Sequence, residues 1–338
     1  MQQATRNDRI DTVRGIACIL LVAYHAIGMN DGSGLRLPEG SWPHVVNDFL
    51  SYFRMPLFTF LSGLVYAYRP VSSPNIPKFL EGKVLRLLVP LLFVGLVTAV
   101  LRAFVPGVNF KVDLANIGLE LLYPNSHLWF IEALFIVFLF VVVLERFAAF
   151  ATFRRALVVF ALSVAWFTLR YDLPTFFSFN RSAYLLPFFL AGMMLQRFQG
   201  ERQRSLVLLL FPILFILLVG LVLGNSEFAE RGIELLAGIS SAMAMVLLMV
   251  RIEWLSMIGA YSYTIYLYHP YGTAGTRVGL NIVGIENPAI IFPIAVVVGI
   301  ILPIVIHMML SRVPYISRMF LGVRAGKSTG RITDRQQA

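Results

Sequence analysis

Apolar runs long enough to cross a lipid bilayer, separated by short polar loops, are the feature that most constrains what this chain can fold into. A membrane-spanning helix needs about 20 mainly apolar residues to cross a hydrocarbon core of roughly 30 Å. Such runs fill most of the 338 residues. Because only 14% of the residues are charged and 58% are hydrophobic, a soluble domain of this size would have too few charges to cover its surface. The sequence therefore predicts an all-α, polytopic membrane helix bundle.

The apolar runs divide the chain into about ten predicted transmembrane helices. They cover residues 11–29, 45–68, 84–105, 127–145, 155–171, 182–198, 205–224, 232–251, 254–273 and 288–311. The first run is long and no small-residue cleavage pattern follows it, so we expect a retained helix rather than a removed signal peptide. We divide the chain into an N-terminal segment (1–10), a transmembrane domain (11–311) and a basic C-terminal tail (312–338).

The distribution of Lys and Arg among the loops predicts the orientation. The N-terminus, the even-numbered loops and the tail together carry 20 of these residues, the opposite loops carry 7, and Arg54 sits inside a span. Positive residues accumulate in cytoplasmic loops, so we expect both termini in the cytoplasm. The net charge of +10 follows from this bias and requires no nucleic-acid partner. The single cysteine, Cys18, excludes a disulfide framework.

Two polar residues of the first predicted helix share one face. Arg14 and His25 are 11 residues apart, close to three full turns, which separates them by roughly 16 Å along the helix axis. Asp11 lies one turn before Arg14 and is placed to pair with it. With the N-terminus inside, Arg14 lies at the inner surface and His25 lies past the midplane. A snorkelling anchor and a hydrogen-bonded packing histidine are the competing interpretations of the two residues.

Charged and polar residues deeper in later spans need polar neighbours, because a charge near the bilayer centre costs at least ~2.5–3.5 kcal/mol on insertion scales. Arg54 lies near mid-depth in the second span, and Glu132, about one turn into the fourth span, is a candidate counter-ion. A purely structural pair is the competing interpretation. Trp129, at the start of the fourth span, also fits an interfacial belt. His269 falls near the outer end of the ninth span, where an interfacial histidine is the alternative.

The predicted orientation sorts these residues by depth. The middle and outer half of the membrane receives His25, Arg54, Glu132 and His269. The inner face receives Lys83 and Arg86, one turn apart at the start of the third span, near Arg14. This arrangement fits a substrate that enters from the cytoplasm and reacts within the bilayer. Generic loop charge is the competing account of Lys83 and Arg86.

Four segments stand in order along nearly the whole chain. They are Arg14 followed by His25, then Arg54 to Gly63, His127 to Phe130, and Gly259 to His269. Together they resemble the motifs of the acyltransferase 3 family of membrane O-acyltransferases, which includes acetylases and succinylases of bacterial polysaccharides. The family's first inner loop usually carries Arg-x-x-Arg, and here Lys83 and Arg86 take those positions. Lysine keeps the charge but lacks the bidentate fork that binds phosphate.

The resemblance implies transfer of an acyl group, acetyl or succinyl among the candidates, from cytoplasmic acyl-CoA to a sugar hydroxyl of an exopolysaccharide or another cell-surface glycan. His25 would be the base that activates the hydroxyl, or a transient acyl carrier. Arg54 would stabilise the thioester oxyanion or orient Glu132. The CoA phosphates would bind Arg14, Lys83 and Arg86. The acceptor would contact Trp129, Ser262, Tyr266 and His269.

We expect no resident cofactor and no metal ion. The expected partners are acyl-CoA, a saccharide or lipid-linked glycan, and the lipid of a bacterial inner membrane. A transporter or flippase of a polysaccharide export system is the main alternative, because it too uses ionisable residues at mid-membrane. A non-catalytic membrane partner of a polysaccharide assembly complex is a third possibility.

Overall fold

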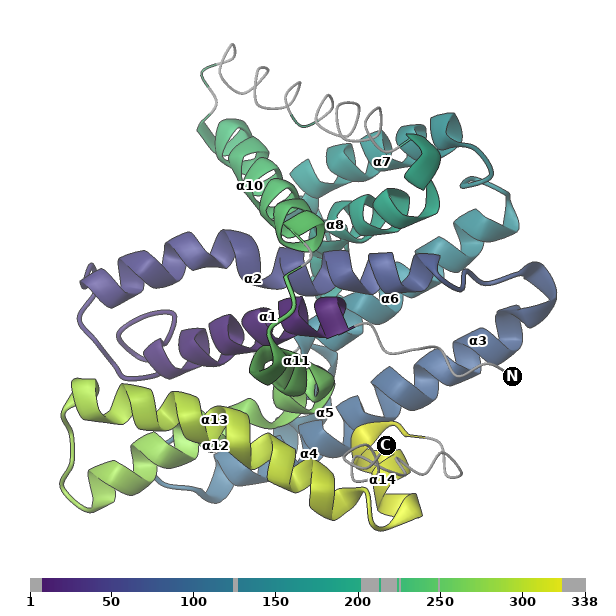
Figure 1. The fold of residues 1–338 in the computed structure, drawn as a ribbon. Coiled ribbons are helices and arrows are strands. Elements are labelled where there is room, and N and C mark those ends of the chain that lie inside the picture. The colour runs from purple at the N-terminus through teal and green to yellow at the C-terminus, as the bar shows by residue number, and fades with distance from the viewer. Residues whose placement is uncertain are drawn as a thin grey trace, which may run out of the picture.

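A computed structural model describes residues 8–123, 127–201, 213, 224, 226–248 and 250–323. Over these residues the fold is a bundle of helices without β-strands (Figure 1). The longer helices are α1 (Asp8–Ile27), α2 (Trp42–Ala67), α4 (Val89–Phe104), α6 (Trp129–Arg146), α7 (Phe153–Thr168), α8 (Phe179–Arg197), α10 (Ser226–Leu248), α12 (Ser262–Ile282) and α13 (Pro288–Leu310). Shorter ones are α3 (Ile76–Lys83), α5 (Ile117–Leu122), α11 (Glu253–Ala260) and α14 (Pro314–Leu321). The predicted all-α membrane bundle is confirmed.

Eight of the predicted spans coincide with one of these helices, and the ninth is divided between α11 and α12. Of the span 205–224, only Ile213 and Gly224 are among the described residues. The count of ten therefore stays a prediction. Four described helical stretches are long and apolar enough to cross a membrane, namely Asp8–Ile27, Ser73–Phe104, Glu227–Leu248 and Pro288–Leu310. Helix α6 is also strongly apolar, but its 18 residues include Glu132, Glu145 and Arg146.

Helix α13 displays the inverted pattern of a lipid-facing helix. Its exposed residues are apolar and recur every three or four positions, as Ile290, Ile294, Val297, Ile301, Val305 and Met308. Its buried residues include the small Ala295 and Gly299, which face the bundle. A soluble helix would expose polar residues instead, so this face of α13 fits contact with lipid tails.

Reciprocal glycine contacts bring helices of the bundle unusually close together. A Cβ on Gly15 of α1 would overlap the carbonyl oxygen of Leu255 in α11, and a Cβ on Gly259 would overlap that of Asp11. Gly63 of α2 and Gly192 of α8 meet each other's helices in the same way. Small residues at such crossings let membrane helices pack backbone to backbone. These contacts fix α1 against α11, and therefore the start of α12 as well.

The ninth predicted span differs from the structure in its shape and its end. The helix breaks at Tyr261, between α11 and α12, and α12 continues through Pro270 to Ile282. A second irregular stretch, the π-helical turn Val84–Leu88, joins α3 to α4 and carries Arg86. Wide turns of this kind insert one residue into a helix and occur often at functional sites.

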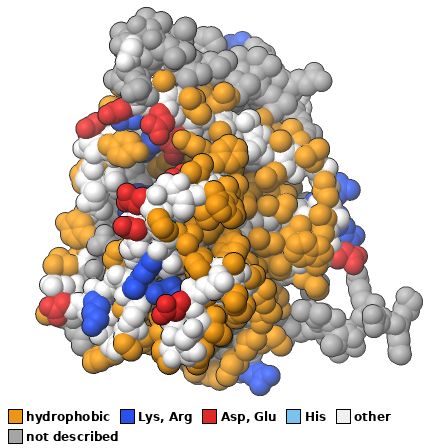
Figure 2. All heavy atoms as spheres, turned by 90° about the vertical axis from the view of Figure 1, so that its left-hand side faces the viewer, with side chains coloured by type: hydrophobic (Ala, Val, Ile, Leu, Met, Phe, Trp, Pro, Cys, Tyr) orange, Lys and Arg blue, Asp and Glu red, His pale blue; other side chains and the backbone are white. Residues whose placement is uncertain are grey.

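Both described chain ends lie at one end of the bundle, where α1 begins and α14 packs beside α4 (Figure 1). We call this the proximal end, and the end at which α1 finishes and α2 starts the distal end. Figure 2 looks onto the distal end, where hydrophobic side chains cover one side of the molecule and charged ones gather on the other. The core between α2, α6, α7 and α8 is filled by aromatic rings such as Phe60, Phe160 and Phe189, all fully buried.

Candidate functional site

His25 lies in the last turn of α1, at the distal end, with a half-buried ring. Its Nδ1 is 3.0 Å from the carbonyl oxygen of Leu21. A carbonyl oxygen only accepts hydrogen bonds, so Nδ1 carries the proton of the neutral ring and donates it to this bond. The second ring nitrogen, Nε2, therefore keeps a free lone pair. A backbone contact within α1 thus prepares this nitrogen as a base or nucleophile.

His269 is fully buried in the middle of α12. This differs from the expected position near the outer end of a helix, because α12 runs on for three further turns. Pro270 has no N–H, so the carbonyl of Tyr266 loses its usual partner one turn ahead. Nδ1 of His269 lies 2.9 Å from that carbonyl oxygen and 2.9 Å from the one of Ile265. Its Nε2 is buried and has no hydrogen-bond partner among the residues that the structure describes.

His127, immediately before α6, is a third histidine at this place, and sequence analysis gave it no role. Its Nε2 lies 3.1 Å from the carbonyl oxygen of Leu267, and its own carbonyl accepts a hydrogen bond from the Tyr266 hydroxyl. The Nε2 contact leaves Nδ1 as the free lone pair of a neutral ring. The available signal was topological, because α6 starts at the same end of the bundle at which α1 finishes.

The three histidine rings form one cluster, contributed by α1, α12 and the residues just before α6. The ring centroid of His269 is 4.6 Å from that of His25 and 5.2 Å from that of His127, while His25 and His127 are 6.4 Å apart. Each ring donates an N–H to a backbone carbonyl, so each offers one lone pair. Within the described part of the chain, no group of three or more His, Cys, Asp and Glu is arranged to hold a metal ion.

Arg54 of α2 is only 4% exposed. Its guanidinium carbon lies 3.3 Å from the ring centroid of Tyr24, and the Tyr24 ring lies 4.9 Å from that of His25. Nη2 donates to the carbonyl oxygen of Asn47 at 3.3 Å, whereas Nε and Nη1 are buried and have no hydrogen-bond partner in the described part of the chain. A buried cation with unused donors is costly unless a ligand anion completes it.

Glu132 of α6 does not pair with Arg54, so the expected counter-ion is wrong. The hydroxyl of Ser178 donates to Glu132 Oε2 at 2.9 Å, and Oε1 is buried with no hydrogen-bond partner within the described ranges. Ser178 and the preceding Phe177 have φ values of 54° and 48°, a left-handed conformation that is strained for residues other than glycine. This turn before α8 presents Ser178 to Glu132, while the Tyr24 ring holds Arg54 toward α1.

The predicted acceptor residues divide into two groups. Tyr266 belongs to the histidine cluster, because its ring lies 5.8 Å from His127 and 6.4 Å from His269. Trp129 faces α8, where its ring lies 5.0 Å from the Arg181 guanidinium carbon. Ser262 is the first residue of α12, seven residues before His269, so it lies roughly 10 Å along the helix from the cluster.

The predicted CoA-binding residues all lie toward the proximal end. Arg14 pairs with Asp11 at 2.9 Å, as the sequence predicted. The Lys83 Nζ lies 3.4 Å from the ring centroid of Phe138 in α6. Arg86 is exposed, and its carbonyl accepts a hydrogen bond from the Tyr263 hydroxyl of α12. Arg14, Lys83 and Arg86 thus lie on three separate elements toward the proximal end.

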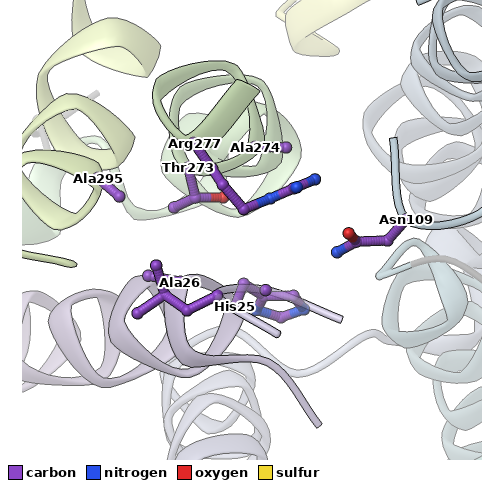
Figure 3. A pocket seen from close by; sticks show the side chains of 9 residues that line it. His25, Ala26, Asn109, Thr273, Ala274, Arg277 and Ala295 are labelled. Atoms are coloured by element: carbon purple, nitrogen blue, oxygen red, sulfur yellow. The ribbon is translucent and has the colours of Figure 1, made fainter. Parts of the chain in front are cut away.

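A small pocket opens over the His25 side of the cluster (Figure 3). Its non-atom space is about 250 Å³, part of which is open solvent. Besides His25 it is lined by the polar residues Asn109, Thr273 and Arg277 and by the loop residues Gly34 and Leu35. The guanidinium of Arg277, the amide of Asn109 and the His25 ring converge on the same space in Figure 3. A substrate hydroxyl placed there would have direct access to His25.

Comparison with known proteins gave one family match. No curated protein and no solved structure matches the chain. The sequence model of the acyltransferase domain matches residues 7–308, which include α1, the histidine cluster and nearly all of α13. This is the family that the four motifs of the sequence resemble. The chain therefore belongs to the acyltransferase 3 family and is a multi-pass membrane protein of the acyltransferase class.

Proposed function

We propose that this protein is an integral membrane O-acyltransferase, which moves an acyl group from cytoplasmic acyl-CoA to a sugar hydroxyl. The observation that carries the proposal is the state of His25. Its Nδ1 is engaged by the Leu21 carbonyl, and its ring lines the pocket at the distal end. A neutral imidazole with one lone pair available is the group that hydroxyl activation requires near neutral pH.

His25 can take part in acyl transfer by two routes. As a base, Nε2 takes the hydroxyl proton while the oxygen forms a bond to the thioester carbon. The carbon–sulfur bond then breaks, and the CoA thiolate recovers the proton from Nε2. As an acyl carrier, Nε2 itself attacks the thioester carbon, and CoA leaves as the thiolate. The sugar oxygen then bonds to the acyl carbon, the bond from that carbon to Nε2 breaks, and the hydroxyl proton passes to the CoA thiolate.

Arg54 has the environment of an oxyanion-stabilising group. Its guanidinium stacks on Tyr24, whose ring lies 4.9 Å from that of His25, and its Nε and Nη1 are buried with no hydrogen-bond partner among the described residues. In a site with little water, hydrogen-bond donors held in this way strongly stabilise the negative charge that develops in the transition state. Glu132 accepts a hydrogen bond from Ser178 and makes no ion pair with Arg54 among the described residues, so the structure favours the oxyanion role of Arg54 over the orientation of Glu132.

The donor would enter from the proximal end, which the proposal places in the cytoplasm. Arg14, Lys83 and Arg86 supply positive charge there for the CoA phosphates. The eleven residues from Arg14 to His25 correspond to roughly 16 Å of helix. The narrow pantetheine arm would carry the thioester along α1 over this distance. The acceptor would be a sugar of an exopolysaccharide or another surface glycan. The protein would reside in a bacterial inner membrane.

The test is transfer of label from acetyl-CoA and succinyl-CoA to glycan acceptors by the purified protein in nanodiscs. We expect labelled glycan and free CoA in equal amounts. A transporter or flippase would give no transfer from either donor, together with movement of glycan across sealed proteoliposomes. NMR comparison of O-acyl groups on the glycans of wild-type and deletion strains extends the test to cells. Identical glycans in both strains would contradict the saccharide acceptor.

A further inference from the structure

Arg277 of α12 forms the wall of the pocket that faces His25 (Figure 3). The residue is only 5% exposed, and its Nη2 donates to the carbonyl oxygen of Gly107 at 2.9 Å. The donors of a guanidinium outnumber this one acceptor. Among the described residues, Arg277 has no carboxylate in ion-pair contact. A cation buried beside a pocket in this way is incomplete without an anion.

Arg36 brings a second positive charge to the same place. Its Nη2 donates to the same Gly107 carbonyl at 3.4 Å, and its Nε donates to Oδ1 of Asn109 at 3.2 Å. Two guanidinium groups therefore share one carbonyl oxygen. Within the described ranges, Arg36 also lacks an ion-pair partner. Because both groups donate to one oxygen atom, their positive charges are close enough to repel each other. Among the described residues, no carboxylate neutralises them.

The loop that carries Arg36 is built to reach this position. Gly28 and Gly34 have φ values of 100° and 53°, and a Cβ on either would overlap the backbone of the loop. The turn folds back on α1 through the Leu35 N–H, which donates to the Ile27 carbonyl at 3.0 Å. Arg36 itself has φ 55°, a strained conformation for a residue with a side chain. Strain of this kind is concentrated at ligand-binding sites.

We propose that Arg36 and Arg277 form an anion subsite, and that the acceptor is an acidic sugar. This inference rests on the proposed function. A carboxylate or phosphate on the acceptor would bind between the two guanidinium groups, which suit such groups through paired N–H donors. The side-chain amide of Asn109 lines the same pocket and is placed to contact the sugar ring of the acceptor. The hydroxyl to be acylated would then face His25 across the same pocket.

The test compares acceptors that differ only in the anionic group. Pairs of methyl glycosides, glucuronoside with glucoside and galacturonoside with galactoside, would be supplied with labelled acyl-CoA to the protein in zwitterionic nanodiscs. Glucose 6-phosphate with glucose supplies the phosphate arm. We expect kcat/KM to favour the acidic member of at least one pair. Substitution Arg277→Gln or Arg36→Gln should lower that preference about 10- to 100-fold. Arg277→Lys, which keeps the charge, should lower it less.

The control is Lys111→Gln, which removes an exposed positive charge two residues after Asn109 without touching the pocket. Equal kcat/KM within every pair, or a preference that survives both glutamine variants, would overturn the acidic acceptor. Binding of the same glycosides can be measured as an increase in the melting temperature of the protein, which requires no turnover. Failure of transfer from every donor would reject the proposed function, and the binding measurement would still decide whether the anion subsite exists.

Discussion

Arg170 and Arg54 are both buried cations of the same bundle, but among the residues that the structure describes only Arg170 has a carboxylate partner. Between α7 and α8, the Nη2 of Arg170 lies 2.6 Å from the carboxylate of Glu234 in α10. At the proximal end, Glu145 binds Arg197 at 2.5 Å in the same manner. Around the histidine cluster, Arg54 contacts an aromatic ring and Arg277 a carbonyl oxygen instead.

We infer that this difference separates the charges that stabilise the fold from those that serve a ligand. A buried ion pair compensates part of the desolvation cost of both groups. The arginines near His25 leave that cost uncompensated, and they converge with the histidines around a pocket. We infer that the α7–α8–α10 side is the structural half of the bundle, and that the α1–α2–α12 side is the reacting half.

The largest expected effect is on the structural side. Glu234→Gln would leave Arg170 buried without a carboxylate, and breaking a buried pair costs about 3–5 kcal/mol of stability. Unfolding in mixed detergent micelles would measure the loss. Acyl transfer per folded molecule should persist. Glu230→Gln, at an exposed position of the same helix, is the matched control and should unfold like the wild type.

Arg54→Leu should show the reverse behaviour. Loss of an oxyanion-stabilising donor lowers kcat by about 100-fold or more. Removal of an unpaired buried cation relieves desolvation, so the melting temperature should stay level or rise. Steady-state kinetics and thermal unfolding of one preparation would check both. A destabilised variant with normal kcat would show that Arg54 belongs with the structural charges.

A smaller effect is expected at the proximal end. Arg86→Gln would remove one charge–phosphate contact with the donor and raise KM for acyl-CoA about tenfold, with kcat little changed. Arg312→Gln, also exposed and just after α13, provides the comparison. Equal KM values for the two variants would remove Arg86 from the donor site.

The smallest effect concerns the backbone around His269. In Pro270→Ala the new N–H would donate to the Tyr266 carbonyl and compete with Nδ1 of His269. The ring would be held less firmly, and kcat should fall a few-fold, as expected for one hydrogen bond of about 1 kcal/mol. Measuring kcat per folded molecule, together with the melting temperature, separates this effect from unfolding. An unchanged kcat would assign Pro270 to helix shape alone.

Much of the fold could be predicted from sequence, because span length and loop charge are local properties. The helix positions follow from span length, and the shared depth of His25 and His269 follows from the alternation of the spans. The Arg14–Asp11 pair follows from a spacing of one helical turn. The rotation of each helix about its axis does not follow, because packing decides it. The sequence therefore predicts that Arg54 pairs with Glu132, whereas in the structure Arg54 contacts Tyr24 and Glu132 accepts a hydrogen bond from Ser178.

The rest of the site depends on contacts between distant segments. His127 joins the cluster through a contact with Leu267, 140 residues away. The pocket needs the fold of the Gly28–Leu35 turn, the position of Asn109, and the continuation of α12 to Arg277. No periodicity within one helix reports these contacts. The roles of the predicted site residues stay predictions until variants are measured.

The central claim, that His25 accepts the proton or the acyl group, has one direct measurement. Single-turnover transfer of labelled acetyl from acetyl-CoA in nanodiscs would be compared for His25→Gln and His307→Gln. His307 of α13 lies outside the histidine cluster, and its Nδ1 is 2.9 Å from the hydroxyl oxygen of Thr264. We predict a loss of at least about 100-fold for His25→Gln and a near wild-type rate for His307→Gln. Wild-type transfer by equal amounts of folded His25→Gln would contradict the account.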